Sequence, residues 1–160
     1  MGSTSDLPVM EKAAQFLDEV NIPFEMNALS AHRTPDEVES FAKGAEARGL
    51  KVIIAGAGMA AALPGVIAAS TTVPVIGVPI KGMLDGLDAM LSIIQMPPGI
   101  PVATVGVNGA LNAAILAAEM LALSDDNLAS RLKSYKAGLK AKIVKANREL
   151  SEVKYKNKVN

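Results

Sequence analysis

Apolar positions along the chain follow two patterns, which alternate from one segment to the next. In residues 7–20, apolar side chains recur every three or four positions, which predicts an amphipathic helix. Residues 52–58 and 73–79 are continuously apolar over a short stretch, which favours buried strands. On these criteria the predicted strands span residues 23–30, 51–58, 73–79 and 100–107. The predicted helices span residues 7–20, 34–48, 61–70, 85–96, 108–123 and 124 to beyond 150.

Boundary residues support several of these helices. Pro8 suits the first turn of the first helix, which Ser5 or Asp6 can cap. The stretch TPDE at 34–37 combines a capping residue, a proline and two acids, which is typical of a helix start. The Arg-Gly pair at 48–49 is typical of a helix end.

The alternation of strands and helices predicts one domain built on an open parallel α/β sheet. In such sheets the ligand binds beyond the carboxyl ends of the strands. Three loops with unusual residues fall at these ends, at 2–6, 30–33 and 56–62. We therefore expect these three loops to form the functional site.

The opening loop MGSTSD is of a kind that normally follows a strand, yet it begins the sequence. We expect an apolar strand to be missing before Met1, which would leave the sheet with a gap or an exposed edge. Residues 1–123 are assigned to the α/β domain, lacking that first strand. Residues 124–160 are assigned to a polar, lysine-rich helical extension of the same domain.

Composition narrows the classes of function. Half of the residues are hydrophobic but only 3% are aromatic, so the core must be built from Ala, Val, Ile, Leu and Met. A formal net charge of zero argues against nucleic acid or an anionic membrane as a partner. With no cysteine and with His32 as the only histidine, disulfides and thiolate or histidine-rich metal sites are excluded. Without a signal peptide or a membrane-spanning apolar run, we expect a soluble, cytoplasmic protein.

The loop GSTSD opens a helix and offers backbone N–H groups, two serine hydroxyls and a positive dipole end, which suit a phosphate. The carboxylate of Asp6 could accept hydrogen bonds from ribose hydroxyls. The alternative is an ordinary helix cap, and from this motif alone the cap is favoured.

The loop SAHRTP contains His32 and Arg33. A guanidinium can bind a phosphate with two parallel hydrogen bonds, and an imidazole can both donate and accept a proton near neutral pH. The alternative is a surface histidine without a function. A polar loop before a helix leaves the two interpretations evenly balanced.

The loop AGAGMAAALPG could let the backbone approach a flat ligand, because glycine and alanine leave room. It is not a dinucleotide fingerprint, since the third glycine and the acidic residue about twenty positions later are absent. Taken alone, tight packing of a helix on a strand is the better interpretation. The C-terminal lysines alternate with acidic and polar residues and indicate a solvated helix face.

Together these motifs resemble the class I N5-carboxyaminoimidazole ribonucleotide mutases of purine biosynthesis. The similar segments are MGSTSD, SAHRTP, AGAGMAAALPG, PVIGVP, SIIQMPPGIPVATV and NAAILAAEML, in the family's order and spacing. They cover the chain from Met1 to about Leu123. The resemblance implies a flavodoxin-like three-layer α/β/α sandwich, followed here by a long C-terminal helix, assembled as a homo-octamer with active sites between subunits.

The resemblance also implies the reaction, which interconverts N5-carboxyaminoimidazole ribonucleotide and 4-carboxy-5-aminoimidazole ribonucleotide without metal, nucleotide triphosphate or organic cofactor. His32 corresponds to the family's general acid/base. In the proposed mechanism it protonates the carbamate nitrogen, CO2 departs and is attacked by C4, and the C4 proton is removed. One imidazole can serve both steps, and the pocket must be closed and dry to retain CO2.

The remaining site positions are also implied by the resemblance. The first loop would contact phosphate and ribose, Arg33 would bind phosphate, the second loop would line the carboxylate pocket, and the third would cover the imidazole ring. These substrate-binding positions are Gly2, Ser3, Ser5, Asp6, Ser30, Ala31, Arg33, Ala57, Gly58 and Leu63.

The sequence departs from the family pattern in the third loop. Met59 stands where the family has a glycine, and Ala62 stands where it has a second histidine. Loss of such a supporting group commonly lowers the rate about 10²–10⁴-fold. Two alternatives to the mutase therefore remain: a weakly active or non-catalytic ribonucleotide-binding homologue, and an AIR carboxylase that uses CO2 directly.

Overall fold

The computed structural model describes residues 1–159 and contains a parallel sheet between two layers of helices. The strands pair in the order β1-β2-β3, with Ile53 opposite Val75 and Ile76 opposite Ala103. Strands buried on both faces need continuous apolar sequence, and β2 is buried at every position. The strands are β1 Ile53–Gly58, β2 Val75–Ile80 and β3 Ala103–Thr104.

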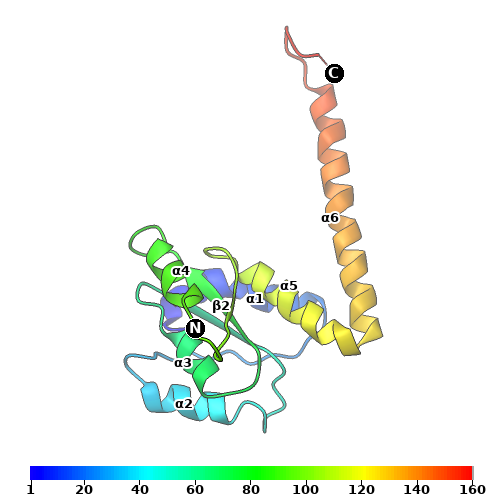
Figure 1. The fold of residues 1–160 in the computed structure, drawn as a ribbon. Coiled ribbons are helices and arrows are strands. Elements are labelled where there is room, and N and C mark those ends of the chain that lie inside the picture. Colours follow the sequence, from blue (N-terminus) through cyan, green and yellow to red (C-terminus); the bar gives the residue numbers. More distant parts are fainter. Residues whose placement is uncertain (160) are drawn as a thin grey trace.

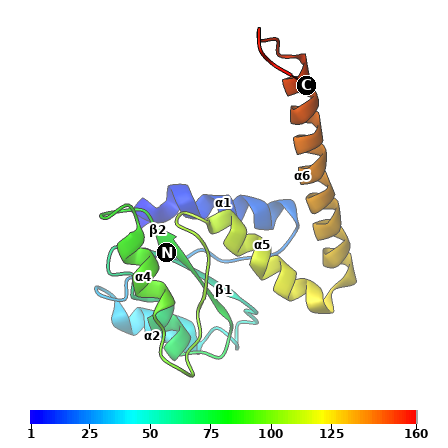
Figure 2. The same ribbon diagram turned by 45° about the horizontal axis from the view of Figure 1, so that its top comes forward.

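Helices cover both faces of the sheet (Figures 1 and 2). α1 and α5 pack on the face to which Ile76, Val78 and Ile80 point. α2, α3 and α4 pack on the other face, over Ile53 and Ala55. The helices are α1 Leu7–Glu19, α2 Pro35–Lys43, α3 Leu63–Ala69, α4 Leu87–Ile94, α5 Ala110–Leu121 and α6 Asp126–Glu152, with 3-10 turns at Thr4–Asp6 and Ala122–Ser124.

The core consists mainly of alanine and aliphatic side chains, as the composition indicated. α5 is buried through a stripe of alanines, which lets its backbone approach the sheet and α1 closely. The larger buried side chains come from the strands, and Ile76 and Val78 are fully covered. Each such side chain stabilises the fold by about 1.5–3 kcal/mol relative to an exposed one. The flavodoxin-like three-layer arrangement expected from the sequence is confirmed.

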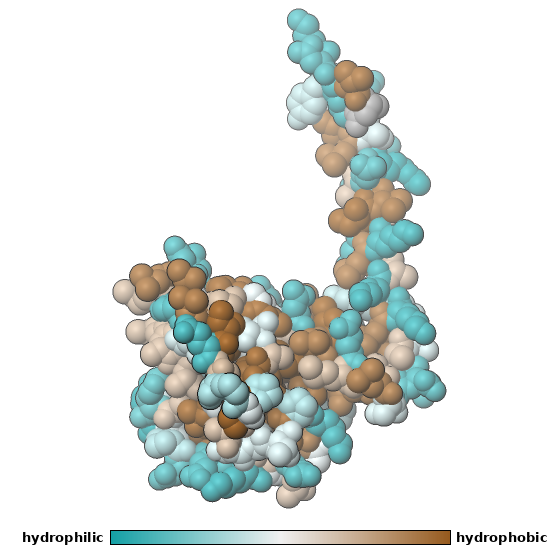
Figure 3. Space-filling model, in the orientation of Figure 1, coloured by the Kyte–Doolittle hydropathy of each residue, from teal (hydrophilic) through white to brown (hydrophobic). Residues whose placement is uncertain are grey.

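α6 leaves the domain after its first turns and projects into solvent (Figure 1). Leu128 is buried in the core, and the Tyr135 ring meets Phe16 edge-on with the centroids 5.1 Å apart. Beyond Tyr135 the apolar side chains on this helix are uncovered, and Ile143 is 72% exposed. Figure 3 shows them as brown groups along the projecting helix.

The prediction of a strand at 23–30 is wrong. Within the described chain these residues form neither helix nor strand, and residues 23–28 are all exposed. The segment returns from the end of α1 (Figure 2), and in the described chain it is not part of the sheet. Among the described residues, the backbone of residues 23–29 bonds only to Met1, through Asn27 and Leu29. A strand needs a hydrogen-bonded neighbour, and apart from Met1 this segment has none.

Two other predicted elements are shorter than expected. The strand predicted at 100–107 is regular only at Ala103–Thr104. The helix predicted to reach residue 48 ends at Lys43 and continues as turns to Gly49, which has a φ of +83°. A glycine in the left-handed region closes this segment, as its position after Arg48 indicated.

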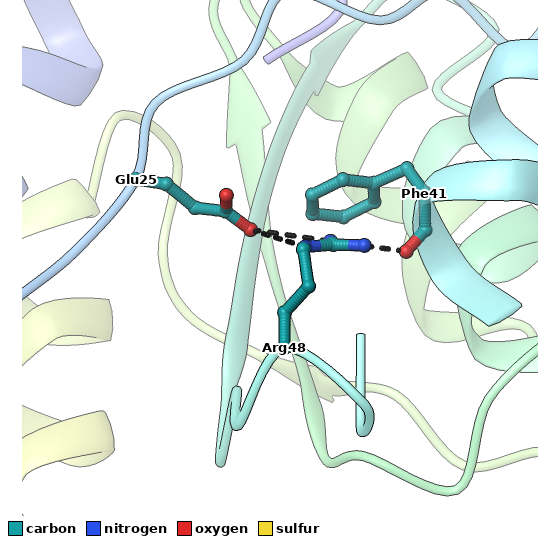
Figure 4. Close-up of polar contacts among 3 residues, drawn as sticks. All are labelled: Glu25, Phe41 and Arg48. Carbon is teal, nitrogen blue, oxygen red and sulfur yellow. Dashed lines mark hydrogen bonds and ion pairs between the residues drawn. The ribbon is translucent and has the colours of Figure 1, made fainter. Parts of the chain in front are cut away.

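An ion pair attaches the segment 23–29 to this turn (Figure 4). Nε and Nη2 of Arg48 donate to the Glu25 carboxylate at 3.3 and 3.2 Å, and Nη2 donates to the Phe41 carbonyl at 3.2 Å. The guanidinium carbon also lies 4.9 Å from the centroid of the Phe41 ring. Exposed ion pairs and cation–π contacts each contribute up to about 1 kcal/mol. This weak attachment positions the outer segment without burying it.

Candidate active site

Two hydrogen bonds join the three loops that the sequence singled out. The Gly2 N–H donates to the Gly56 carbonyl at 3.0 Å, which attaches the N-terminal loop to the carboxyl end of β1. Nη2 of Arg33 donates to the Gly2 carbonyl at 3.3 Å, which attaches the histidine loop to the N-terminal loop. The loops at 2–6, 30–33 and 56–62 therefore meet at one edge of the sheet, where open parallel sheets bind ligands.

The N-terminal loop is a closed cap rather than a set of free donors. The Ser3 N–H donates to Asp6 Oδ2 at 3.0 Å, and the Ser5 N–H donates to Ser3 Oγ at 3.3 Å. The Asp6 N–H donates to the Ser3 carbonyl at 3.1 Å. We expected these N–H groups to be available to a phosphate, but they are used within the loop. The serine hydroxyl protons and the positive end of α1 remain available.

Asp6 has a structural role in this cap. Its side chain is 8% exposed, and one oxygen accepts the bond from Ser3. A buried carboxylate needs such a donor, because an unpaired one is strongly disfavoured. We suggested that Ser5 or Asp6 would cap the first helix, but Ser3 and Asp6 form a reciprocal capping box around the 3-10 turn instead.

The histidine loop is a tight turn held by its flanking residues. The Ser30 N–H donates to Thr34 Oγ1 at 2.9 Å, and the Thr34 N–H donates back to the Ser30 carbonyl at 2.8 Å. The Arg33 Nε donates to Ser30 Oγ at 3.3 Å, which directs the guanidinium toward Gly2. His32 is exposed on this turn. A rigid turn therefore presents an accessible imidazole beside an oriented guanidinium.

Thr34 differs from its predicted role. We expected its side chain to cap α2, but the hydroxyl donates to the Ser30 carbonyl at 3.1 Å instead. Pro35 begins α2, with Asp36 and Glu37 in the first turn as predicted. The hydroxyl therefore tightens the turn that carries His32.

The third loop packs its small residues for structural reasons. A Cβ at Gly56 would lie 2.5 Å from Met10 Sδ, and one at Gly58 would lie 3.3 Å from the Ile80 carbonyl oxygen. The side chains of Ala57 and Leu63 are buried in the core below the loop. A ligand could meet the backbone of this loop but not these two side chains.

Met59 adopts an unusual conformation directly after β1. Its φ is +55°, in the left-handed region that disfavours residues other than glycine by about 1–2 kcal/mol. Its side chain is 59% exposed and reaches Gly82, where a Cβ would lie 3.6 Å from Met59 Cγ. Methionine therefore occupies a position whose backbone conformation favours glycine. Ala62 follows at the start of α3 and is half-buried.

Sequence reasoning missed a further loop at this edge, residues 81–86. The Asn108 side chain accepts from the Lys81 N–H at 2.9 Å, and the Asn108 N–H donates to the Pro79 carbonyl at 2.8 Å. The Lys81 ammonium pairs with Asp85 at 2.9 Å. The available signal was positional, since these residues directly follow the predicted strands at 73–79 and 100–107.

The described residues hold no group of three or more His, Cys, Asp or Glu side chains that could bind a metal ion. No helix within residues 1–159 combines the length and apolar character needed to span a bilayer. At this edge of the sheet the polar groups include the His32 imidazole, the Arg33 guanidinium, serine hydroxyls, backbone groups and the Lys81–Asp85 ion pair. This set suits binding of a phosphorylated ligand with proton transfer.

Known proteins resemble this chain over most of its length. The model of a family described as AIR carboxylase matches residues 1–142. The chain is 57% identical to an N5-carboxyaminoimidazole ribonucleotide mutase of Pyrococcus abyssi over 88% of this chain and 81% of that protein. It is 51% identical to the enzyme of that name from Thermotoga maritima over 100% of this chain and 94% of that protein.

A second kind of relative carries a different name. A phosphoribosylaminoimidazole carboxylase of Schizosaccharomyces pombe is 50% identical over 98% of this chain, which corresponds to 29% of that longer protein. Among solved structures, the crystal structure of Treponema denticola PurE superposes with a TM-score of 0.85 at 34% identity, covering 94% of each chain.

Proposed function

The chain belongs to the AIR carboxylase family, and we propose that it is an N5-carboxyaminoimidazole ribonucleotide mutase, an isomerase of de novo purine (IMP) biosynthesis. It would interconvert N5-carboxyaminoimidazole ribonucleotide and 4-carboxy-5-aminoimidazole ribonucleotide in the cytoplasm without a cofactor. One observation carries the proposal: Arg33 links the histidine turn to the N-terminal loop at the ligand-binding edge of the sheet. The names of the relatives at 57% and 51% identity support the same activity.

The phosphate of the substrate would bind between Arg33 and the N-terminal loop. The Arg33 guanidinium is already oriented by Ser30 and the Gly2 carbonyl. Its free N–H groups, the hydroxyls of Ser3 and Ser5, and the positive end of α1 can all face one anion. The implied contacts at Ser30 and Ala31 with the carboxylate, and at Ala57, Gly58 and Leu63 with the ring, belong to this proposal. For Ala57 and Leu63 they would come from the backbone.

His32 would act as the only general acid/base. It gives a proton to the carbamate nitrogen as the N–C bond breaks and CO2 is released. The C4 carbon then attacks CO2, and His32 recovers a proton from C4 as the aromatic ring is restored. The protons balance over the cycle, so a single histidine is sufficient.

A second copy of the chain would close the site. His32 is exposed in the single chain, whereas trapped CO2 requires a covered pocket. Apolar side chains surround the edge, including Met83 at 66% and Leu84 at 74% exposure. Figure 3 shows brown groups over α4 and the loop before it. We propose a homo-oligomer, with the octamer implied by the resemblance, that buries these groups.

An isotope experiment tests the proposed reaction. Carbamate substrate labelled with ¹³C in its carboxyl group is incubated with the protein and an excess of unlabelled bicarbonate. A mutase retains the label in the C4-carboxylate of the product. A label diluted to the level of the bicarbonate pool would contradict the mutase.

Direct carboxylation is the second candidate, favoured by the name of the Schizosaccharomyces pombe relative. It predicts turnover of AIR with bicarbonate at modest concentrations and no use of the carbamate. A non-catalytic ribonucleotide-binding role, suggested by Ala62, predicts saturable binding without either turnover.

A further inference from the structure

The zero net charge of the chain is the sum of two opposite charges. The body of the domain, residues 1–125, contains 13 acidic and 6 basic residues, which gives a formal net charge of −7. Residues 126–160, which include α6, contain 10 basic and 3 acidic residues, which gives +7. The body and the projecting helix therefore attract partners of opposite charge, and each suits the other.

α6 carries one apolar stripe, of which only the first half is covered. Apolar residues recur at intervals of three or four positions from 128 to 150, so they lie on one side of the helix. The first members, Leu128, Leu132 and Tyr135, pack against the core. The rest form an exposed distal stripe, which consists of Leu139, Ile143, Ala146 and Leu150. An exposed continuation of a buried stripe indicates a contact with another molecule.

α4 carries a second uncovered stripe. Leu87, Leu91 and Ile94 are exposed at the same helical spacing, whereas Ala89 and Ile93 on the inner side are buried. Figure 3 shows brown groups both over α4 and along the projecting helix. The two helices thus present the two apolar faces that a helix–helix contact needs.

The two stripes cannot meet within one chain. α4 and the projecting part of α6 lie on opposite sides of the domain in both views (Figures 1 and 2). α6 spans 27 residues, about 40 Å, and runs away from the sheet. A contact between the two stripes therefore needs a second copy of the chain.

Charge favours this contact over the two symmetric ones. Pairing α6 with α6 would bring two segments of +7 together, and pairing α4 with α4 would bring together two bodies of −7. Pairing α6 of one copy with α4 of another brings opposite charges together and buries both stripes at once. A nucleic acid or an anionic membrane would attract α6 but repel the body.

We propose that the distal stripe of α6 docks on α4 of a second copy. The segment from 139 to 153 is about 20 Å long and α4 about 12 Å, so the docked helix also reaches Met83 and Leu84 in the adjacent loop 81–86. The second copy thereby covers the open side of the site. That last step rests on the proposed function, whereas the contact itself does not.

The test compares Ile143→Asp, Leu91→Asp and Ala141→Asp in the full chain. The first breaks the α6 stripe and the second breaks the α4 stripe. The third is the matched control, because it adds the same charge to the opposite side of α6, where Ala141 is exposed. Sedimentation velocity over a concentration series measures association. We expect each of the first two to weaken association by about 10-fold or more, and the control to stay within about twofold of the wild type.

Mixing the two defective variants identifies the contact. An equimolar mixture of Ile143→Asp and Leu91→Asp should associate again, because the first supplies an intact α4 and the second an intact α6. A mixture that stays dissociated would overturn the proposal. A loss confined to Ile143→Asp would overturn it in favour of α6 pairing with α6, and a loss confined to Leu91→Asp in favour of α4 pairing with α4.

Two further outcomes would also overturn the proposal. One is a wild-type chain that stays monomeric throughout the concentration series, whatever anionic polymer α6 then binds. The other is wild-type association in all three variants. Each measurement reports assembly rather than turnover, so a failure here is distinguishable from a failure of the proposed mutase activity.

Discussion

The histidine turn and the loop 81–86 lie at the same edge of the sheet but are built differently. The turn from Ser30 to Thr34 is closed by reciprocal side-chain and backbone bonds. The loop 81–86 has positive φ at Leu84, Asp85 and Gly86 and leaves apolar side chains in solvent. The histidine turn is therefore fixed by bonds within one chain, whereas the loop 81–86 leaves apolar side chains uncovered in the single chain.

The largest expected effect is at the imidazole of the closed turn. His32→Ala should lower kcat by about 10³-fold or more, because no other general acid/base of its kind is present. The oligomeric state and melting temperature should not change, since no hydrogen bond to this side chain is found in residues 1–159. Steady-state kinetics and size-exclusion chromatography measure the two effects. Near-normal turnover would show that the imidazole is not the acid/base.

Ala62→His tests whether the second histidine of the family assists His32. If the family's second histidine assists the first, restoring it should raise kcat by about 10²-fold, the lower end of such contributions. Ala62→Gln is the matched control, since it adds polar volume without a titrating group. The same modest change in both variants would mean that this position does not assist proton transfer.

Arg33 tests whether the guanidinium bridge serves binding. Arg33→Lys keeps the charge but loses the paired donors, and Arg33→Met loses both. We expect KM to rise about 10-fold for lysine and about 100-fold for methionine, with smaller effects on kcat. A loss of stability without a change in KM would instead assign Arg33 a purely structural role at Gly2.

Met59 offers a stability test of the third loop. Met59→Gly should stabilise the fold by about 1 kcal/mol, because glycine adopts a φ of +55° without the penalty of a Cβ. This corresponds to a rise in melting temperature of about 3 °C. Met59→Ala keeps the Cβ and should show no such rise. Equal stability of the glycine and alanine variants would contradict a backbone origin.

The smallest expected effect is a pH dependence from Met1. Burial lowers the pKa of this ammonium below its usual 8.0, so the unfolded chain holds more protons in the window just below 8.0. The free energy of unfolding should therefore rise with pH through that window and be lowest below it. Urea denaturation from about pH 6 to about pH 9 measures the slope. N-terminal acetylation should remove this contribution, and an unchanged slope would assign it to other groups.

The sequence predicted the helical layers and the meeting of three loops at one edge of the sheet, because apolar periodicity and strand ends are local signals. It did not predict which hydrogen-bond partners the polar groups of the loops would have. The Ser3–Asp6 capping box uses donors that we expected to face a ligand, and Thr34 bonds to Ser30 rather than to its helix. Such choices depend on partners that become adjacent only after folding.

Strand pairing was the least predictable feature for the same reason. The segment 23–30 has a strand-like sequence, but among the described residues no strand pairs with it. Asn108 was overlooked because its contacts with Lys81 and Pro79 span more than twenty residues of sequence. Local pattern therefore indicated which residues could form the elements, and tertiary contacts decided which of them did.

The most direct test mixes the purified chain with N5-carboxyaminoimidazole ribonucleotide in the presence of a chelator and without ATP, and follows the ultraviolet absorbance of the C4-carboxylated product. The account predicts catalytic conversion that His32→Ala abolishes. Saturable binding of the substrate with no conversion above the uncatalysed rate, even after Ala62→His, would contradict it.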